Sequence, residues 1–163
     1  EGLLNFTQRY RKLTQIPTPE FQTVQVHDFI EHITRLVQPE LDKRKINLQI
    51  TGQPASSTFD PSLMEQVIIN LIQNAMDAVE KVERPQIVIQ FQLENERFHF
   101  KIKDNGLGIA SGDLDKIFVP FFTTKKNGSG IGLALSQQII LLHGGQIFAQ
   151  SEIGVGTTIS FTL

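Results

Sequence analysis

The chain has no cysteine, which excludes disulfide bonds, thiol catalysis and cysteine-ligated metal sites. It also has no basic excess, because 15 lysines and arginines stand against 17 acidic residues; this argues against nucleic acid as a partner. Its longest apolar stretch, Ile131 to Leu142, is interrupted by polar residues and is shorter than the roughly 20 residues of a membrane-spanning helix. The first ten residues lack the basic start and apolar middle of a signal peptide.

The chain does contain enough apolar material for one folded domain. Of its 163 residues, 40% are apolar and 20% are charged, and a length near roughly 150 residues is typical of a single domain. A chain of this size and composition can bury a substantial core, so we expect an ordered fold rather than a disordered chain.

The N-terminal segment is predicted to be a helix that ends at a proline-rich stretch. Its apolar residues recur at spacings of 3, 4 and 3, which is typical of one side of a helix: Leu3, Phe6, Tyr10 and Leu13. Pro17 and Pro19 end this pattern, because proline lacks an amide donor and disfavours helix in the residue before it. We therefore divide the chain into residues 1–22, the end of a longer helix plus a linker, and residues 23–163, the domain proper.

The remaining elements follow from apolar periodicity and from proline and glycine breaks. Helices are expected over residues 28–43, 61–82 and 131–143, with a short one near 114–118. Strands are expected over residues 23–26, 46–50, 87–93, 97–103, 146–151 and 157–163. Helices together with mostly adjacent, alternating strands predict an α+β fold: a two-layer sandwich in which helices cover one face of a mixed sheet.

Asn70, Asn74 and Asp77 form the first motif with chemical content. Their spacing of i, i+4 and i+7 places the three side chains on one face of a helix. The opposite side is expected to carry core residues: Val67, Leu71 and Ala78. Asparagine is a mediocre helix former, so two of them in an apolar helix indicate either a ligand site or a buried hydrogen-bonded network. The motif alone leaves both interpretations open.

Residues 104–130 form a long segment with little predicted structure, which is typical of a functional loop or of disorder. It begins with Asp104, Gly106 and Gly108, directly after an expected strand. Glycines two positions apart permit close approach of a ligand, and the aspartate is an acceptor suited to an exocyclic amine. A plain turn has the same composition. We interpret the segment as a lid over a ligand.

Gly128, Gly130 and Gly132 open the last expected helix. Free amides and the positive end of the helix dipole make such a position suitable for phosphate oxygens. The segment lacks the Lys-Ser/Thr of a P-loop and the preceding strand of a dinucleotide fold, so neither of those motifs applies.

Taken together, these motifs resemble those of a known family. The segments NLIQNAMDA, DNGLGI, IFVPFFTTK and GSGIGLAL, followed by HGG and GVGTT, are similar to the N, G1, F and G2 boxes of bacterial sensor histidine kinases. The resemblance covers residues 23–163 and implies their catalytic ATP-binding domain, with the Bergerat sandwich of gyrase, Hsp90 and MutL and a lid at about 104–130. The preceding helix resembles the tail of the family's dimerisation hairpin, which carries the phosphoacceptor.

The resemblance implies a role for each motif, with ATP and Mg²⁺ as cofactors. Asn70 and Asn74 become the catalytic pair: Asn74 supplies a side-chain oxygen to Mg²⁺, and Asn70 lies beside it near the phosphates. Asp104 accepts from the adenine amino group. The implied ATP-contacting residues are Asn74, Asp77, Asp104, Gly106, Gly108, Lys125, Gly128, Gly130, Gly132, Leu133 and Thr157. The F-box phenylalanines are implied to anchor the lid and to meet the dimerisation helices: Phe118, Phe121 and Phe122.

Asn70 bears on the type of reaction. In the related ATPases, the residue four positions before the magnesium-binding asparagine is a glutamate that activates water. Asparagine cannot take up a proton near neutral pH, whereas a histidine acceptor needs no base, because neutral imidazole already offers a lone pair. Asn70 therefore favours phosphoryl transfer to a side chain over hydrolysis.

The chain also departs from the family's pattern. Many sensor kinases carry a lysine or arginine where Asp77 stands, so a cation that neutralises phosphate must come from elsewhere. Lys125 and Lys126 in the lid are candidates, but surface lysines in a mobile loop are the commoner explanation. His27 and Asp28 resemble the start of a phosphoacceptor box, but the residues that follow them lack its basic residue and proline. We therefore expect the acceptor histidine upstream of Glu1.

The resemblance implies that the chain binds Mg-ATP and passes the γ-phosphoryl to a histidine on the dimerisation domain of the same protein, with a response regulator as the next acceptor. It further implies a homodimeric full-length protein and a cytoplasmic domain, the parent being either free or anchored in the inner membrane. The alternatives are a Bergerat ATPase, an anti-sigma serine kinase and a degenerate nucleotide-binding scaffold.

Overall fold

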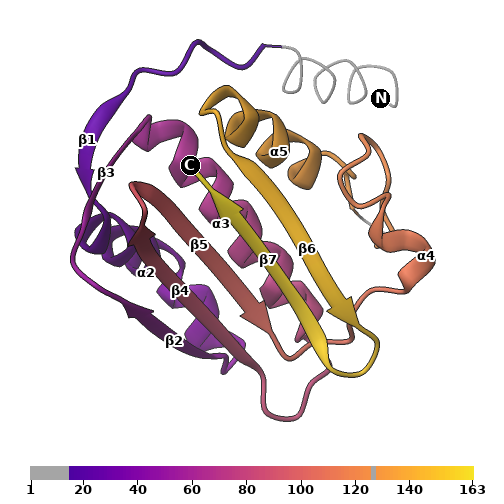
Figure 1. The fold of residues 1–163 in the computed structure, drawn as a ribbon. Coiled ribbons are helices and arrows are strands. Elements are labelled where there is room, and N and C mark those ends of the chain that lie inside the picture. Colours follow the sequence, from indigo (N-terminus) through magenta and orange to yellow (C-terminus); the bar gives the residue numbers. More distant parts are fainter. Residues whose placement is uncertain (1–14, 126–127) are drawn as a thin grey trace.

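The computed structural model describes residues 15–125 and 128–163, and Figure 1 shows the fold. The predicted N-terminal helix and Lys126 lie outside the described residues. In chain order the elements are β1 (Gln22–Gln25), α2 (Val26–Lys43), β2 (Asn47–Gly52), β3 (Ser56–Phe59), α3 (Pro61–Ala78), β4 (Gln86–Glu94), β5 (Arg97–Asp104), α4 (Ser111–Leu114), α5 (Gly132–Leu142), β6 (Gln146–Glu152) and β7 (Gly156–Thr162).

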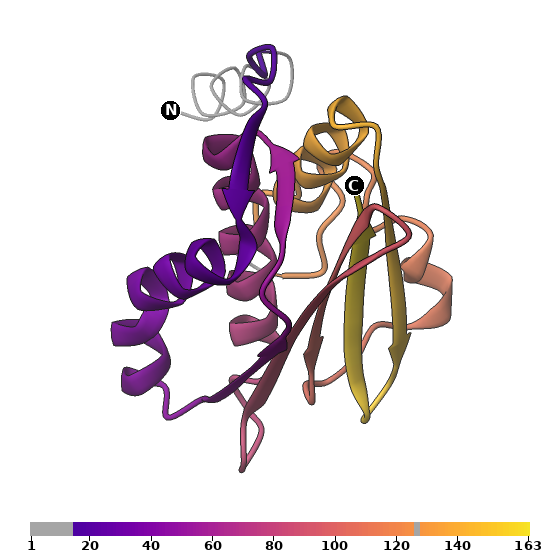
Figure 2. The same ribbon diagram turned by 60° about the vertical axis from the view of Figure 1, so that its left-hand side comes forward.

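The main sheet has five strands in the order β2-β4-β5-β7-β6. β2 runs parallel to β4, whereas β4–β5, β5–β7 and β6–β7 are antiparallel, so the sheet is mixed. Helices α2, α3 and α5 lie on one face of it (Figure 2). This two-layer α+β sandwich confirms the predicted fold class.

A small second sheet was not predicted. β1 pairs antiparallel with β3, from Gln22 opposite Phe59 to Gln25 opposite Ser56. β3 reads Ser-Ser-Thr-Phe, in which only the phenylalanine is apolar, so apolar alternation gives no signal for a strand. The pairing attaches the end of the linker to the domain.

The predicted short helix near residues 114–118 is wrong in position. The helical turn is α4, at Ser111–Leu114, and the residues after it form turns. These turns are of the i→i−3 kind: the Lys116 amide donates to the Asp113 carbonyl at 2.9 Å, and the Val119 amide donates to the Lys116 carbonyl at 2.8 Å. The apolar residues of 114–118 cover little more than one turn, so their spacing does not fix where the helical turn begins. The other predicted boundaries differ from the observed ones by up to about four residues; α3, for example, ends at Ala78 rather than near 82.

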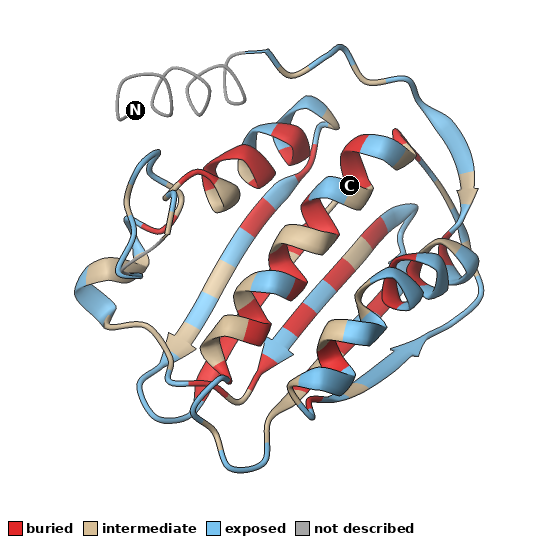
Figure 3. Ribbon diagram, turned by 180° about the vertical axis from the view of Figure 1, so that it is seen from behind, coloured by how far each residue is buried: buried red, intermediate tan, exposed pale blue. Residues whose placement is uncertain are grey.

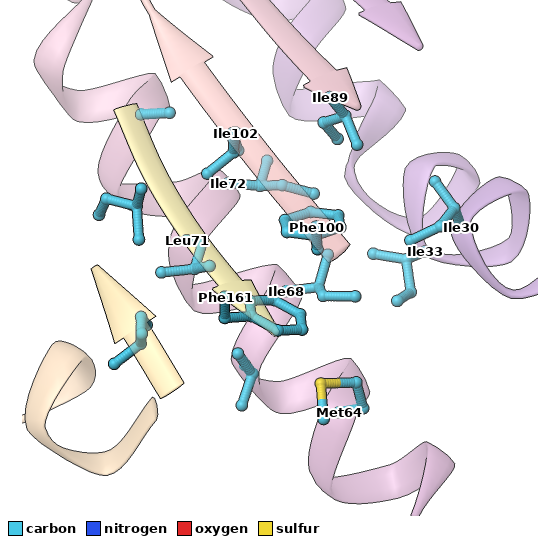
Figure 4. Packing of buried hydrophobic residues seen from close by; sticks show 14 of the residues in the cluster. Ile30, Ile33, Met64, Ile68, Leu71, Ile72, Ile89, Phe100, Ile102 and Phe161 are labelled. Atoms are coloured by element: carbon cyan, nitrogen blue, oxygen red, sulfur yellow. The ribbon is translucent and has the colours of Figure 1, made fainter. Parts of the chain in front are cut away.

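The core lies between α3 and the sheet. Figure 3 shows buried residues recurring along α3 and along the strands behind it. Ile68, Leu71 and Ile72 of α3 are fully buried and pack in the same cluster as Phe100 and Phe161 of the sheet (Figure 4). α3 is thereby held in a fixed orientation over the sheet, and so are the polar residues on its other side.

Asp60 caps the N-terminal end of α3. Its Oδ1 accepts from the Leu63 amide at 3.0 Å, and Pro61 follows in the first turn. Its Oδ2 accepts from the Glu20 amide at 2.8 Å, which adds a link to the linker. Burial opposes ionisation of this carboxyl, but the backbone amides of Leu63, Glu20 and Ser62 hold its pKa below the ordinary value.

Within the described ranges, no helix is both long and apolar enough to cross a membrane.

Candidate functional site

A cavity of about 490 Å³ lies between α3, the end of β5 and the segment that precedes α5. The sequence-predicted site residues Asn70, Asn74, Asp77, Asp104, Gly108, Lys125, Gly128, Gly130, Gly132, Leu133 and Thr157 all line it. Residues from positions 70 to 157 thus meet at one place. Of the predicted set, Gly106 alone does not line the cavity.

Asn70, Asn74 and Asp77 face this cavity from α3, so the predicted common face is observed. Leu71 and Ala78, which were expected in the core, also line the cavity, although Leu71 is fully buried. Ala78 continues the helical line of Leu71, and at the last turn of α3 that line faces the cavity. The residue after it, Val79, is only 1% exposed and takes the core position instead.

Asn70 joins α3 to α5. Its Nδ2 donates to the hydroxyl of Ser136 at 2.9 Å, and Ser136 is only 1% exposed. Its Oδ1 lies against Gly132, where a side-chain Cβ would collide with it. Glycine at position 132 therefore leaves room for the Asn70 side chain between α3 and α5, where Ser136 holds its amide nitrogen.

Asn74 and Asp77 share one cationic partner from the lid. The Lys125 ammonium donates to Oδ1 of Asn74 at 3.1 Å and to Oδ2 of Asp77 at 2.8 Å. Arg44, at the C-cap of α2, approaches the other carboxylate oxygen of Asp77 at 3.2 Å. Burial works against the charge of Asp77, yet the hydrogen bond and charge of Lys125, with smaller contributions from Gln73 and Arg44, lower its pKa.

Asp104 lies at the other end of the cavity and is 6% exposed. Its Oδ1 accepts from the Gly106 amide at 2.8 Å and from the Thr157 amide at 3.2 Å. Burial raises the pKa of this carboxyl, although the two amides and the charge of Lys125 act in the opposite direction. The residue is thus a rigidly held acceptor at the margin of the cavity.

Gly106 does not line the cavity; its amide donates to the carboxylate of Asp104. Its Cα packs against the Ala78 carbonyl, so a side chain would not fit there. Gly108 lines the cavity with φ +74°, and a Cβ there would meet the Glu152 carbonyl. The motif therefore combines one glycine that positions the aspartate with one that lets the backbone turn at the cavity wall.

The phenylalanines of the lid differ in environment. Phe122 lines the cavity, and Phe118 packs against the core. Phe121 is 40% exposed. Its amide donates to the Gly130 carbonyl at 2.8 Å, which joins these two positions of the lid. The implied lid-anchoring role thus has packing evidence for Phe118.

Ser136 and Arg44 are site residues that the sequence interpretation missed. Ser136 is visible in the sequence as a polar interruption of an apolar helix, which is a signal for an inward-facing hydrogen bond. Arg44 is one of three consecutive basic residues, and nothing in the sequence distinguishes it from its neighbours.

The donor set suits a hard cation that brings some of its own ligands. Asn74 offers an amide oxygen at the cavity, and Mg²⁺ prefers oxygen ligands while keeping water and substrate phosphates in its shell. Among the residues that the structure describes, no three His, Cys, Asp or Glu side chains cluster as a metal site. The residues present therefore fit a magnesium ion shared with a bound phosphate compound rather than a stand-alone protein site.

Comparison with known proteins gives the family. Residues 59–163 match the family described as "Histidine kinase-, DNA gyrase B-, and HSP90-like ATPase". The chain belongs to this family. The solved catalytic domain of histidine kinase ThkA superposes with a TM-score of 0.80 at 27% identity, covering 88% of this chain and 97% of that one.

Two sensor-type relatives narrow the assignment within the family. Sensor histidine kinase ZraS of Klebsiella oxytoca is 34% identical over 146 residues, which cover 88% of this chain and 31% of that protein. Sporulation kinase D of Bacillus subtilis is 32% identical over 151 residues, covering 90% and 29%. The predicted histidine kinase ATP-binding domain is thus confirmed. The chain spans about a third of the length of these relatives.

Proposed function

We propose that this histidine kinase ATP-binding domain binds Mg-ATP in the cavity and transfers the γ-phosphoryl to a histidine on a dimerisation domain of the same protein. A response regulator is the proposed next acceptor. The observation that carries the proposal is the pairing, in one cavity, of a buried carboxylate at Asp104 with the amide and ammonium groups of Asn74 and Lys125.

Asp104 is proposed to recognise the adenine. Oδ1 already accepts from Gly106 and Thr157, which fixes the carboxylate plane and leaves Oδ2 as the acceptor for an exocyclic amine. The apolar lining next to it includes Leu107 and Ile159, which suits a flat heterocycle.

The phosphates are proposed to lie toward Asn74 and the lid. Mg²⁺, when bound, would neutralise and orient the phosphates, with Asn74 as its side-chain ligand. Lys125 is proposed to neutralise phosphate charge, and Gly128, Gly130 and Gly132 to present amides. Catalysis would then consist mainly of placing the γ-phosphoryl in line with the acceptor nitrogen.

Asn70 is proposed to favour transfer over hydrolysis. Its amide nitrogen donates to Ser136, its oxygen lies next to Gly132, and an amide is no base near neutral pH. This arrangement counts against the ATPase alternative. The contact with Ser136 adds to the implied role of Asn70 a link between α3 and α5, while Asn70 still lines the cavity.

The test is phosphoryl transfer from γ-labelled ATP to a separately produced dimerisation hairpin that carries the acceptor histidine. We expect Mg²⁺-dependent, acid-labile label on the hairpin and only slow release of inorganic phosphate. Fast steady hydrolysis without any label on the hairpin would favour the ATPase. Neither binding nor turnover would favour the scaffold.

A further inference from the structure

Three elements meet at the carboxylate of Asp77. Arg44 Nη1, from the end of α2, lies 3.2 Å from Oδ1, and Gln73 Nε2, one turn earlier on α3, lies 3.1 Å from the same oxygen. Lys125 Nζ, from the lid, lies 2.8 Å from Oδ2. Asp77 is therefore the point at which the lid, α3 and the end of α2 are joined.

Arg44 is itself held in place. Its Nε lies 2.7 Å from Oε1 of Glu40 in an i,i+4 pair on α2, and its side chain is 29% exposed. The Arg44 pKa is raised, chiefly by the hydrogen bond to Glu40, so the guanidinium stays charged. An arginine fork that is fixed on one side by Glu40 can fix a second carboxylate on the other.

The ion pairs connected to Asp77 carry one net positive charge, while Asp104, which also lines the cavity, lies outside this network. The connected ion pairs contain Lys43, Arg44 and Lys125 as cations and Glu40 and Asp77 as anions, three against two. Asp77 would repel a phosphate on its own, but here both of its oxygens face cations. Its net effect on a nucleotide therefore depends on whether it keeps Lys125 in position.

The ammonium that Asp77 holds also reaches the amide oxygen of Asn74, at 3.1 Å. This is the oxygen proposed to bind Mg²⁺, so the ammonium must leave it when the metal ion arrives. The contact with Asp77 on the neighbouring turn allows that step without releasing the lysine from the site.

We propose that Asp77, fixed by Arg44, is a positioning residue that keeps Lys125 at the phosphate end of the cavity. The Lys125 ammonium there supplies the positive charge that an aspartate at position 77 cannot supply. This inference rests on the proposed function. It assigns to Arg44 and Asp77 an effect on nucleotide affinity that passes entirely through Lys125.

A double-mutant cycle tests this dependence. Binding of trinitrophenyl-ATP to the full chain is measured with Mg²⁺ for wild type, Lys125→Gln, Asp77→Asn and the double variant. We expect about tenfold weaker binding for Lys125→Gln and about threefold to tenfold weaker binding for Asp77→Asn, in the range of charge-assisted contacts that are partly exposed. The double variant should bind within about a factor of two of Lys125→Gln.

Three further variants complete the design. Arg44→Gln should weaken binding by about twofold to threefold in the wild-type background. In the Lys125→Gln background the same substitution should leave the affinity unchanged. Lys116→Gln is the matched control for charge, because it makes the same charge change in the same segment; its contacts are with Asp113 at 3.5 Å and with the ring of Phe122 at 5.9 Å from the centroid, and neither involves Asp77. Asp77→Glu should recover at least half of the affinity lost in Asp77→Asn.

A readout without nucleotide separates positioning from general destabilisation. Hydrogen exchange of the amides at 122–125 and 128–131 should become faster in Asp77→Asn, while exchange in α3 stays unchanged. Tighter nucleotide binding by Asp77→Asn would mean that the carboxylate repels phosphate, which overturns the inference. Additive losses in the cycle would overturn it as well. A wild-type protein that fails to bind the analogue refutes the proposed function itself.

Discussion

The two ends of the cavity are built differently. At one end Asp104 is nearly buried and is held by backbone amides of Gly106 and Thr157, whose positions follow from the sheet. At the other end Asn74 and Asp77 are half-buried and are held by Lys125, a 44% exposed side chain from the lid. The first end is formed before any ligand arrives, whereas the second is held by ionic contacts that a ligand can exchange.

This difference predicts that substitutions at the two ends fail in different ways. Changes at the Asp104 end should alter affinity for the nucleotide with or without metal ion. Changes at the Asn74 end should alter the response to Mg²⁺ and the rate of transfer. The following predictions run from the largest expected effect to the smallest.

Asn74→Ala should abolish Mg²⁺-dependent transfer to an added acceptor hairpin, a loss of about 100-fold or more, because the proposed metal ligand is gone. The measurement is single-turnover transfer from γ-labelled ATP. Circular dichroism should show an intact fold, since Asn74 is half-buried and faces the cavity rather than the core. A variant as active as wild type would reject the role assigned to Asn74.

Asp104→Asn should weaken ATP binding by about 1–3 kcal/mol, because a charged acceptor is lost. The free energy of unfolding at pH 7 should stay equal or rise, because burial raises the pKa of Asp104 and so disfavours its ionised form in the folded state. Titration of a fluorescent ATP analogue and urea unfolding measure the two effects. Unchanged affinity would remove Asp104 from the base pocket.

The same carboxyl predicts a pH dependence. Affinity for the analogue should fall as the pH drops through the raised pKa of Asp104, since the protonated form loses its acceptor charge. Asp104→Asn should show a flatter profile over that range. Parallel profiles for the two proteins would show that another group titrates.

Asp60→Ala should lower the free energy of unfolding by about 1–2 kcal/mol, because it removes the cap of α3, while Asp60→Asn should retain most of the stability. The pKa of Asp60 is lowered in the folded state, so its ionic contribution is complete above the ordinary carboxyl pKa of about 3.9 and is lost as the pH falls through the folded value. Urea unfolding between pH 7 and pH 3 checks this. A pH-independent difference between wild type and Asp60→Asn would contradict it.

Ser136→Ala should lower the free energy of unfolding by about 1 kcal/mol, because it leaves the Asn70 amide without its buried partner. It should also raise background hydrolysis only slightly, since Asn70 remains an amide. Strong ATP hydrolysis by this variant would argue against the coupling role of Asn70.

Much of the fold could be predicted because it depends on periodicity. The apolar spacing along α3 and the alternation in β4 and β5 place those elements to within a few residues. The strand β3 could not be found, because Ser-Ser-Thr-Phe has no alternation and its pairing with β1 spans more than 30 residues. Likewise, the apolar residues of 114–118 cover little more than one turn, so their spacing could not place α4, which lies at Ser111–Leu114.

The cavity residues could be predicted where a motif places them on one face, as with Asn70 and Asn74. The contacts that distinguish their roles could not, because they join distant segments: Ser136 lies 66 residues beyond Asn70, and Arg44 lies 33 residues before Asp77. Only the packing of α5 and α2 against α3 reveals that Asn70 contacts Ser136 of α5 and that Asp77 contacts Arg44.

The most direct test of the central claim is equilibrium binding of an ATP analogue to the wild-type chain, with and without Mg²⁺. The account predicts saturable binding that Mg²⁺ strengthens in wild type, and binding in Asn74→Ala that persists but no longer responds to Mg²⁺. Absence of binding, or an undiminished Mg²⁺ response in Asn74→Ala, would contradict the assignment of this cavity to a nucleotide and its metal ion.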